Sequence, residues 1–208
     1  MTAVEDRPLR ADAARNVERI LRAARNVYGD LGPDAQVEAV ARRAGVGERT
    51  LYRRFPAKAD LVRAALDQSI AEDLMPAITD ARRTADALHG LTQLIEAAIS
   101  LGAREQNLLI AAQRAGSLTA DISDSLNEAL NELVHRGQQD GVIRTDLVAE
   151  DILRIIGMLY SVLSTMEPNS DGWRRYVALM LDAISTNERQ PLPPAAAFHA
   201  LEPNNWPL

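Results

Sequence analysis

The chain has 208 residues, enough for one large or two small domains, and 47% of them are hydrophobic while only 4% are aromatic. Abundant Ala and Leu, with very few stretches of strict apolar–polar alternation, predict an all-α protein. The absence of cysteine excludes disulfides, thiolate metal sites and cysteine nucleophiles, and it fits a reducing cytoplasm.

The formal net charge of −6 conceals an uneven distribution. Residues 1–60 contain 12 Lys and Arg against 9 Asp and Glu, giving +3, whereas residues 61–208 contain 11 against 20, giving −9. This asymmetry suggests a head that faces DNA on an acidic body. Because the sequence has no run of 18 apolar residues and no signal-peptide core, we expect a cytoplasmic protein without a membrane partner.

The first sixty residues begin with a polar segment followed by helical periodicity. Residues 1–10 are expected to form a flexible arm, whose Arg7 and Arg10 could lie along DNA or make no contact at all. A first helix is predicted from Ala11 to about Gly29. Its apolar positions are Val17, Ile20, Leu21, Ala24, Val27 and Tyr28. The residues from Gly29 to Pro33 then break the chain.

Two short helices with a tight turn are predicted between Val37 and Leu61. Apolar residues fall on one helical face at Val37, Val40, Ala41 and Ala44, and again at Leu51, Tyr52 and Phe55. Gly45 allows the first helix to stop, and Gly47 can cap the second. This is the pattern of a helix-turn-helix, which presents its second helix to the major groove of DNA.

The second of these helices carries side chains that packing does not require. They are Glu48, Arg49, Thr50, Arg53 and Arg54. Guanidinium groups pair with phosphate oxygens and with O6 and N7 of guanine, so the arginines favour a DNA contact. An arginine-rich turn of helix is, however, more often an ordinary solvated surface, and charge alone does not decide between the two.

The remainder of the chain reads as a helical body. A helix is predicted from about Ala57, and Pro76 should end or kink it. Further helices are predicted over Thr84–Leu101, Arg104–Ala115 and Thr119–Gln139, closed by Gly102, Gly116 and Asp140-Gly141. In the last two helices, Asp146 is expected to cap a segment reaching Met166, and Ser170 or Asp171 a segment reaching Ile184. Their broad apolar faces favour pairing across a two-fold axis.

No catalytic or metal-binding constellation is apparent. His89, His135 and His199 lack metal-ligand spacing, and the common nucleotide, hydrolase and metalloprotease motifs are absent, so we predict no enzyme, no cofactor and no metal. A ligand cavity in the body is one interpretation of its small residues and methionines; core packing is the competing one. Those residues are Ala97, Ala98, Ala111, Ala112, Gly157, Met158, Met166 and Met180.

The run from Ala41 to Leu61, ARRAGVGERTLYRRFPAKADL, resembles the DNA-binding motif of the TetR/AcrR family of bacterial transcriptional regulators. The likeness extends over roughly residues 15–62, and the last two predicted helices resemble the family's dimerisation helices. It implies a three-helix head with a helix-turn-helix in residues 1–56 and a ligand-binding and dimerisation body in residues 57–188. Residues 189–208 would form a Pro-rich tail, expected to be extended or disordered.

The resemblance also implies a set of DNA-binding residues. They are Gln36, Glu48, Arg49, Thr50, Tyr52, Arg53, Arg54 and Lys58. In the family, the positions of Thr50, Tyr52 and Lys58 usually contact phosphates, and those of Glu48, Arg49, Arg53 and Arg54 face base edges. Three positions depart from the pattern. Gly47 replaces the usual Ser and Gln36 a frequent Thr, which affects backbone contacts, while Arg54 replaces a frequent His, which changes what could be read.

We therefore predict a DNA-binding transcriptional regulator, a repressor that binds an inverted-repeat operator as a homodimer and is released by an unidentified small-molecule effector. The alternative is a helical interaction or scaffold protein whose basic head binds acidic partners without sequence-specific DNA binding. The regulator predicts a steep salt dependence and a loss of specificity on Arg53→Ala, whereas the scaffold predicts neither.

Overall fold

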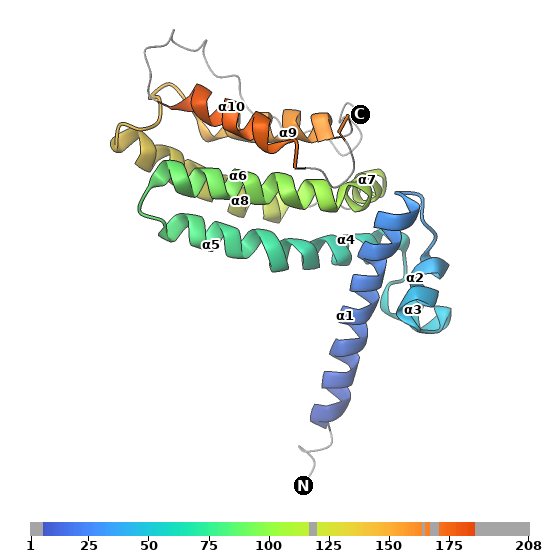
Figure 1. The fold of residues 1–208 in the computed structure, drawn as a ribbon. Coiled ribbons are helices and arrows are strands. Elements are labelled where there is room, and N and C mark those ends of the chain that lie inside the picture. Colours follow the sequence, from blue (N-terminus) through green and yellow to red (C-terminus); the bar gives the residue numbers. More distant parts are fainter. Residues whose placement is uncertain (1–5, 117–119, 164, 167–170, 186–208) are drawn as a thin grey trace. The chain divides into compact units, whose positions relative to one another are not determined.

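The computed structural model describes residues 6–116, 120–163, 165–166 and 171–185, and the regular elements in this part of the chain are helices (Figure 1). One isolated antiparallel bridge joins Ile143 to Ser185. The elements are α1 (Asp6–Leu31), α2 (Val37–Ala44), α3 (Glu48–Arg54), α4 (Lys58–Ser69), η1 (Ile70–Leu74), α5 (Met75–Arg83), α6 (Ala87–Arg104), α7 (Gln106–Arg114), α8 (Ala120–Gln139), α9 (Ala149–Leu163) and α10 (Arg174–Ile184). The predicted all-α fold is confirmed.

The chain forms two compact units. Among the described residues, the first unit comprises 6–68 and 105–116, and the second comprises 69–104 and 120–185. The first unit thus contains α1 to α4 together with α7, and the second contains the remaining helices. No helix in the described ranges is long and apolar enough to cross a membrane.

Helix α1 begins earlier than the sequence indicated. It starts at Asp6 rather than Ala11, so residues 6–10 are helical, while residues 1–5 of the expected arm lie outside the described residues. Pro8 is tolerated because it lies in the first turn, where amide groups have no intrahelical acceptor, and the following alanines favour the helix. The later part of α1 supplies the core of the first unit through buried Ile20, Ala24 and Val27.

Helix α7 joins the first unit through a buried ion pair. Arg25 on α1 donates from Nε to Oε1 of Glu105 over 2.8 Å, and only 6% of Glu105 is exposed. Asn107 adds a long bond to the carbonyl of Gly29, and Arg114 pairs with Asp34 at 2.9 Å. Since a buried charge is costly without a partner, the pair of Arg25 with Glu105 holds α7 against α1.

In the second unit, Pro76 neither ends the helical run nor interrupts it. Between α4 and α5 the backbone widens into the π-helical stretch η1, and Met75 donates its amide to the carbonyl of Ile70, five residues back. Pro76 then occupies the first turn of α5, where a missing amide hydrogen costs little. The sequence correctly indicated a perturbation at Pro76 but not its form.

Gly102 does not close a helix, contrary to the sequence expectation. It lies inside α6, where a Cβ atom would stand 2.2 Å from Cε1 of Tyr160 on α9. Its missing side chain therefore admits the tyrosine ring, whose hydroxyl donates to the carbonyl of Ala98 over 2.8 Å. Burial raises the pKa of that hydroxyl.

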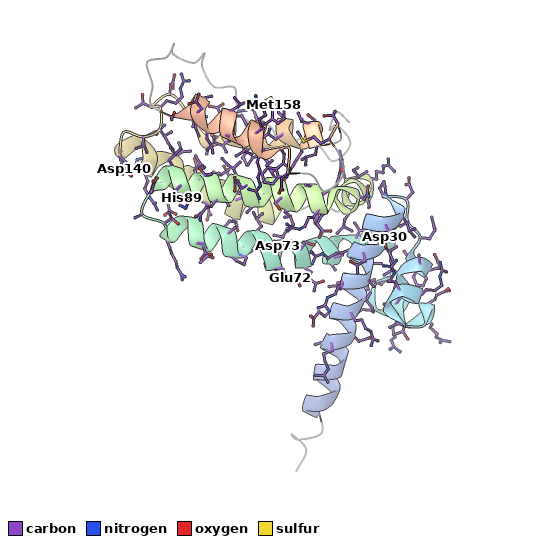
Figure 2. The ribbon with its side chains drawn as sticks, in the orientation of Figure 1. Asp30, Glu72, Asp73, His89, Asp140 and Met158 are labelled. Atoms are coloured by element: carbon purple, nitrogen blue, oxygen red, sulfur yellow. The ribbon has the colours of Figure 1, made fainter. Side chains whose placement is uncertain are left out.

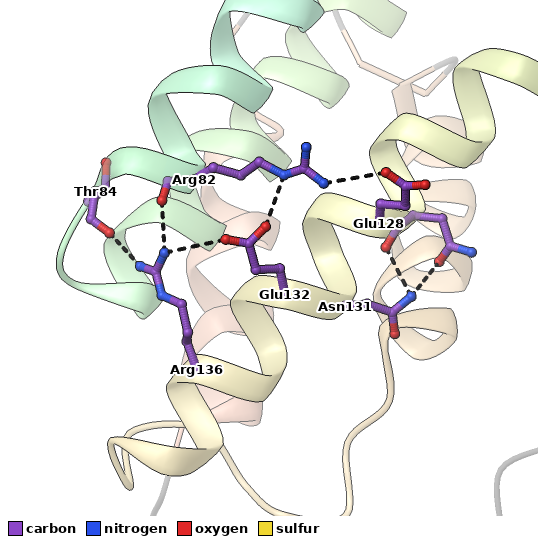
Figure 3. A network of polar contacts seen from close by, with 7 residues as sticks. Arg82, Thr84, Glu128, Asn131, Glu132 and Arg136 are labelled. Atoms are coloured by element: carbon purple, nitrogen blue, oxygen red, sulfur yellow. Dashed lines mark hydrogen bonds and ion pairs between the residues drawn. The ribbon is translucent and has the colours of Figure 1, made fainter.

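The C-terminal end of α5 is fastened to α8 by a polar network (Figure 3). Arg136 donates to the carbonyl of Arg82, in the last turn of α5, and to that of Thr84, which follows the helix; carbonyls at a helix end lack intrahelical donors. The guanidinium of Arg82 in turn pairs with Glu132 at 3.0 Å and with Glu128 at 3.5 Å. These contacts fix the α5–α8 packing from the solvent side.

Asp146 and Asp171, two of the predicted caps of the last two helices, do not cap them. Asp146 pairs with Arg144 at 2.5 Å, and α9 begins at Ala149, where the carboxylate of Asp151 accepts the amide of Val148 instead. Helix α9 ends at Leu163, before Met166. At α10 the residue before the helix is Trp173, and Asp171 contributes its backbone carbonyl to Arg174. Ser170 and residues 187–208 lie outside the described residues.

Candidate DNA-binding site

The turn between α2 and α3 orients the second helix. Gly45 ends α2 with a φ of 65°, a left-handed conformation that favours glycine, and its amide reaches back to α2 carbonyls. Gly47 begins α3 in an extended conformation and offers no side-chain cap. Leu51 is fully buried and Phe55 nearly so, and together they anchor α3 on the core of the first unit. The opposite side of α3 therefore faces solvent.

Most of the side chains predicted to bind DNA are on that open side. Six are exposed, namely Gln36, Glu48, Arg49, Tyr52, Arg53 and Arg54, and two, Thr50 and Lys58, are partly buried. On α3 itself, Leu51 is buried and the other six residues are exposed or partly buried, so their contacts with DNA stay a prediction.

The three arginines of α3 differ from other arginines of the same unit. Arg43 pairs with Asp30 at 2.9 Å, and Arg25 pairs with Glu105. Within the described residues, Arg49, Arg53 and Arg54 form no ion pair. Their guanidinium groups thus keep their donors available for a ligand such as phosphate or guanine.

Tyr52 is held by a residue that the sequence analysis did not single out. Its hydroxyl donates to Oε1 of Glu38 on α2 over 2.7 Å, although 40% of Tyr52 is exposed. This bond is the first cause that holds the pKa of Glu38 below its ordinary value, and it raises the pKa of Tyr52. The two residues are 14 positions apart, so the sequence gives no sign of this hydrogen bond, which depends on how α2 packs against α3.

Lys58 and Gln36 are turned toward the protein in this structure. The ammonium of Lys58 lies 5.5 Å from the ring centroid of Tyr28 and makes a long contact of 3.5 Å with the carbonyl of Pro33. The side-chain amide of Gln36 donates to the carbonyl of Asp34 over 3.0 Å. Gln36 precedes α2 and is exposed, whereas Lys58 begins α4 and is partly buried.

An open hollow of about 720 Å³ adjoins the same surface. It lies between α1, α3 and the end of α4, and its polar lining includes Asn16, Glu18, Arg53 and Arg54. The hollow places two of the free arginines at the edge of a groove that also carries a carboxylate.

Side chains expected around a ligand cavity in the body have mixed positions. Ala98 and Met180 are buried in the second unit, but Met158 on α9 is 60% exposed and thus lines no interior wall (Figure 2). Ala111 and Ala112 are buried in the first unit, on α7. His89 lies on α6, and no group of metal-binding side chains occurs among the residues described (Figure 2).

Comparisons with known proteins agree with this geometry. Residues 20–65 match the model of bacterial regulatory proteins of the tetR family. A TetR transcriptional regulator from Streptomyces coelicolor is 27% identical, with 81% of this chain and 98% of that chain covered and a TM-score of 0.58. A TetR regulatory protein from Mycobacterium vanbaalenii is 25% identical over 86% and 100%, with a TM-score of 0.61.

A third structure shares the fold at lower identity. LfrR from Mycobacterium smegmatis, a TetR-like regulator solved in complex with proflavine, is 20% identical over 83% of this chain and 95% of that chain, with a TM-score of 0.57. A search of curated proteins found no significant match. Regulators of this family are DNA-binding transcription factors and not enzymes. Residues 20–65 thus match the DNA-binding region of the TetR family, and the shared all-helical fold supports a DNA-binding transcriptional regulator of that family.

Proposed function

We propose that this regulator is a cytoplasmic repressor that binds an inverted-repeat operator as a homodimer and leaves it when a small molecule binds the body. In this proposal residues 1–56 form the DNA-binding domain and residues 57–188 the ligand-binding and dimerisation domain. The observation that carries the proposal is the exposed face of α3, where Arg49, Arg53 and Arg54 have no ion-pair partner among the described residues.

The operator contacts divide by chemistry. We assign base-edge contacts to Glu48, Arg49, Arg53 and Arg54, because carboxylates accept from cytosine and guanidinium groups donate to guanine. We assign phosphate contacts to Thr50, Tyr52 and Lys58, whose hydroxyl and ammonium groups are donors of the kind that phosphate oxygens accept. Gln36 precedes α2 and is assigned a contact with the DNA backbone.

A homodimer is supported by the exposed apolar side chains of the last two helices. Met158 on α9 is 60% exposed, and Tyr176 and Leu179 on α10 are 42% and 56% exposed. Large apolar side chains exposed together on neighbouring helices mark an interaction surface. A two-fold axis through α9 and α10 would bury them and set two α3 helices about one turn of DNA apart.

Release by a small molecule is supported by the likeness of fold to a regulator that binds one. LfrR, solved with proflavine, shares the helical architecture of this chain. An effector acts as a switch when it binds the non-binding conformation more tightly, by roughly 2–5 kcal/mol for a strong response. The chemistry of the effector is left open, because the lining of such a site varies with its ligand.

The test starts with selection of bound fragments from the source genome, followed by footprinting of the selected site. We expect a two-fold symmetric footprint and an affinity that falls steeply with salt. Arg53→Ala should weaken operator binding by about 5- to 150-fold, on the basis of about 1–3 kcal/mol for one base-edge contact. Arg63→Ala is the matched control, since Arg63 pairs with Asp67 on α4, and it should change affinity little.

Oligomeric state is tested separately by sedimentation. Leu179→Glu should convert a dimer to monomers and abolish the symmetric footprint, because a carboxylate cannot be buried in an apolar interface without a large cost. A wild-type protein that sediments as a monomer, or one that shows no preference among DNA sequences, would refute the proposal.

A further inference from the structure

The hydroxyl of Tyr52 has one proton, and the structure shows where that proton goes in the free protein. It is donated to Oε1 of Glu38 over 2.7 Å, from the exposed surface of α3 to α2. A carboxylate and a phosphate are both acceptor-only groups, so a single hydroxyl proton serves one of them at a time. Any anion that Tyr52 is to contact must therefore replace Glu38 as the acceptor.

The surroundings of this pair make the competition direct. Both residues belong to the first unit, Tyr52 is 40% exposed, and Glu38 is only partly buried, so an arriving phosphate can reach the hydroxyl. Two other charged residues act on the pair: Arg42 on α2 helps to lower the pKa of Glu38, and Glu48 on α3 helps to raise the pKa of Tyr52. Glu38 is therefore a negative charge on a surface of mixed sign, where it opposes an arriving phosphate that Arg42 attracts.

We infer that Glu38 is a positioning residue that competes with DNA phosphate for the Tyr52 hydroxyl and so limits the affinity of the regulator for DNA. The inference rests on the proposed function, because it assigns phosphate as the ligand of Tyr52. Phosphates carry no sequence information, and the limit therefore applies to operator and non-operator DNA alike. A lower affinity for phosphates shortens the time that the protein stays bound to non-operator DNA.

The test is a double-mutant cycle with Glu38→Gln, Glu38→Ala and Tyr52→Phe, measured by operator affinity at fixed salt. Glu38→Gln leaves a weaker, neutral acceptor, and Glu38→Ala leaves none. Both should tighten binding, by about three- to tenfold for Glu38→Ala, since the net contribution of one exposed hydrogen bond is on that scale. In the Tyr52→Phe background the gain should fall to the small part, about twofold, that comes from removing a charge.

Two further measurements separate this role from a merely structural one. The gain should be equal on operator and scrambled DNA, which leaves the ratio of the two affinities unchanged. Asp67→Asn, which removes a carboxylate paired with Arg63 on α4, is the control for net charge and should not reproduce the gain. A gain that persists in full beside Tyr52→Phe, or affinities that stay equal or fall in both Glu38 variants, would overturn the inference while leaving the proposed function intact. Failure of the wild-type protein to bind DNA would overturn both.

Discussion

Gly102→Ala should destabilise the second unit, and the structure allows its cost to be worked out. The new Cβ would lie 2.2 Å from Cε1 and 2.7 Å from Cζ of Tyr160. Carbon atoms in contact prefer a separation of about 3.5–4.0 Å, so the ring must retreat by more than an ångström. Overpacking of this kind typically costs about 1–3 kcal/mol.

A second cost arises from the hydroxyl of the displaced ring. Tyr160 would lose its 2.8 Å bond to the carbonyl of Ala98, and a buried hydroxyl without a partner costs about 1–3 kcal/mol. The better helix propensity of Ala offsets about 1 kcal/mol. We expect a net loss of roughly 2–3 kcal/mol, which lowers the Tm by about 5–10 °C in a domain of this size.

The assay is thermal and urea unfolding at one protein concentration, because association raises apparent stability. Gly29→Ala is the control: no atom lies within 4 Å of its added Cβ in α1, and the change should be neutral or stabilising. The cost of Gly102→Ala should nearly vanish when measured in a Tyr160→Ala background, where no ring remains to be displaced. An equal cost in both backgrounds would refute the assignment of Gly102 to a close helix approach.

Three further predictions concern buried groups. Burial raises the pKa of Tyr28 to about 12, whereas a tyrosine in the unfolded chain has a pKa near 10, so the unfolded chain loses this proton first. The free energy of unfolding should therefore fall between about pH 10 and 12. Tyr28→Phe should flatten that fall when urea unfolding is measured as a function of pH. Arg25→Met removes the arginine that pairs with buried Glu105 and should lower the free energy of unfolding by roughly 1–3 kcal/mol. Glu105→Gln leaves no buried charge and should lower it less. Gly90→Ala puts a Cβ 2.8 Å from the carbonyl oxygen of Ala81, which should cost about 1–3 kcal/mol in the same assay; an unchanged Tm would contradict this.

Helical periodicity predicted the elements because it is a local property. The ends at Gly45 and Gly141 were also predictable, and both residues have positive φ angles, 65° and 70°. Gly102 was not, since a glycine that ends a helix and one that admits a neighbouring ring look alike in sequence. Nor does a proline reveal whether the chain bends or widens, and at Pro76 it widens into η1.

In the candidate site, too, some features were predictable from the sequence and others were not. Exposure of the α3 arginines follows from the burial of Leu51 and Phe55 at helical spacing, which the sequence displays. The bond between Tyr52 and Glu38 depends on the angle at which α2 meets α3, and the ion pair of Arg25 with Glu105 joins residues 80 positions apart. Such contacts are set by tertiary packing and leave no local signal.

A net charge of −6 is consistent with a DNA-binding protein because phosphates respond to local charge. At physiological salt the Debye length is about 8 Å, so charges beyond a few side-chain diameters contribute little to a given contact. Several arginines elsewhere in the described ranges are neutralised in place, as Arg104 is by Asp73 at 2.8 Å and Arg174 by Glu96 at 2.9 Å. On α3 the guanidinium groups of Arg49, Arg53 and Arg54 have no such ion pair among the described residues. The helix carries one carboxylate of its own, Glu48, and Glu38 on α2 contacts it through Tyr52. The affinity for DNA should therefore respond far more to Glu38, which contacts Tyr52, than to Asp67 of the same unit, which pairs with Arg63 on α4.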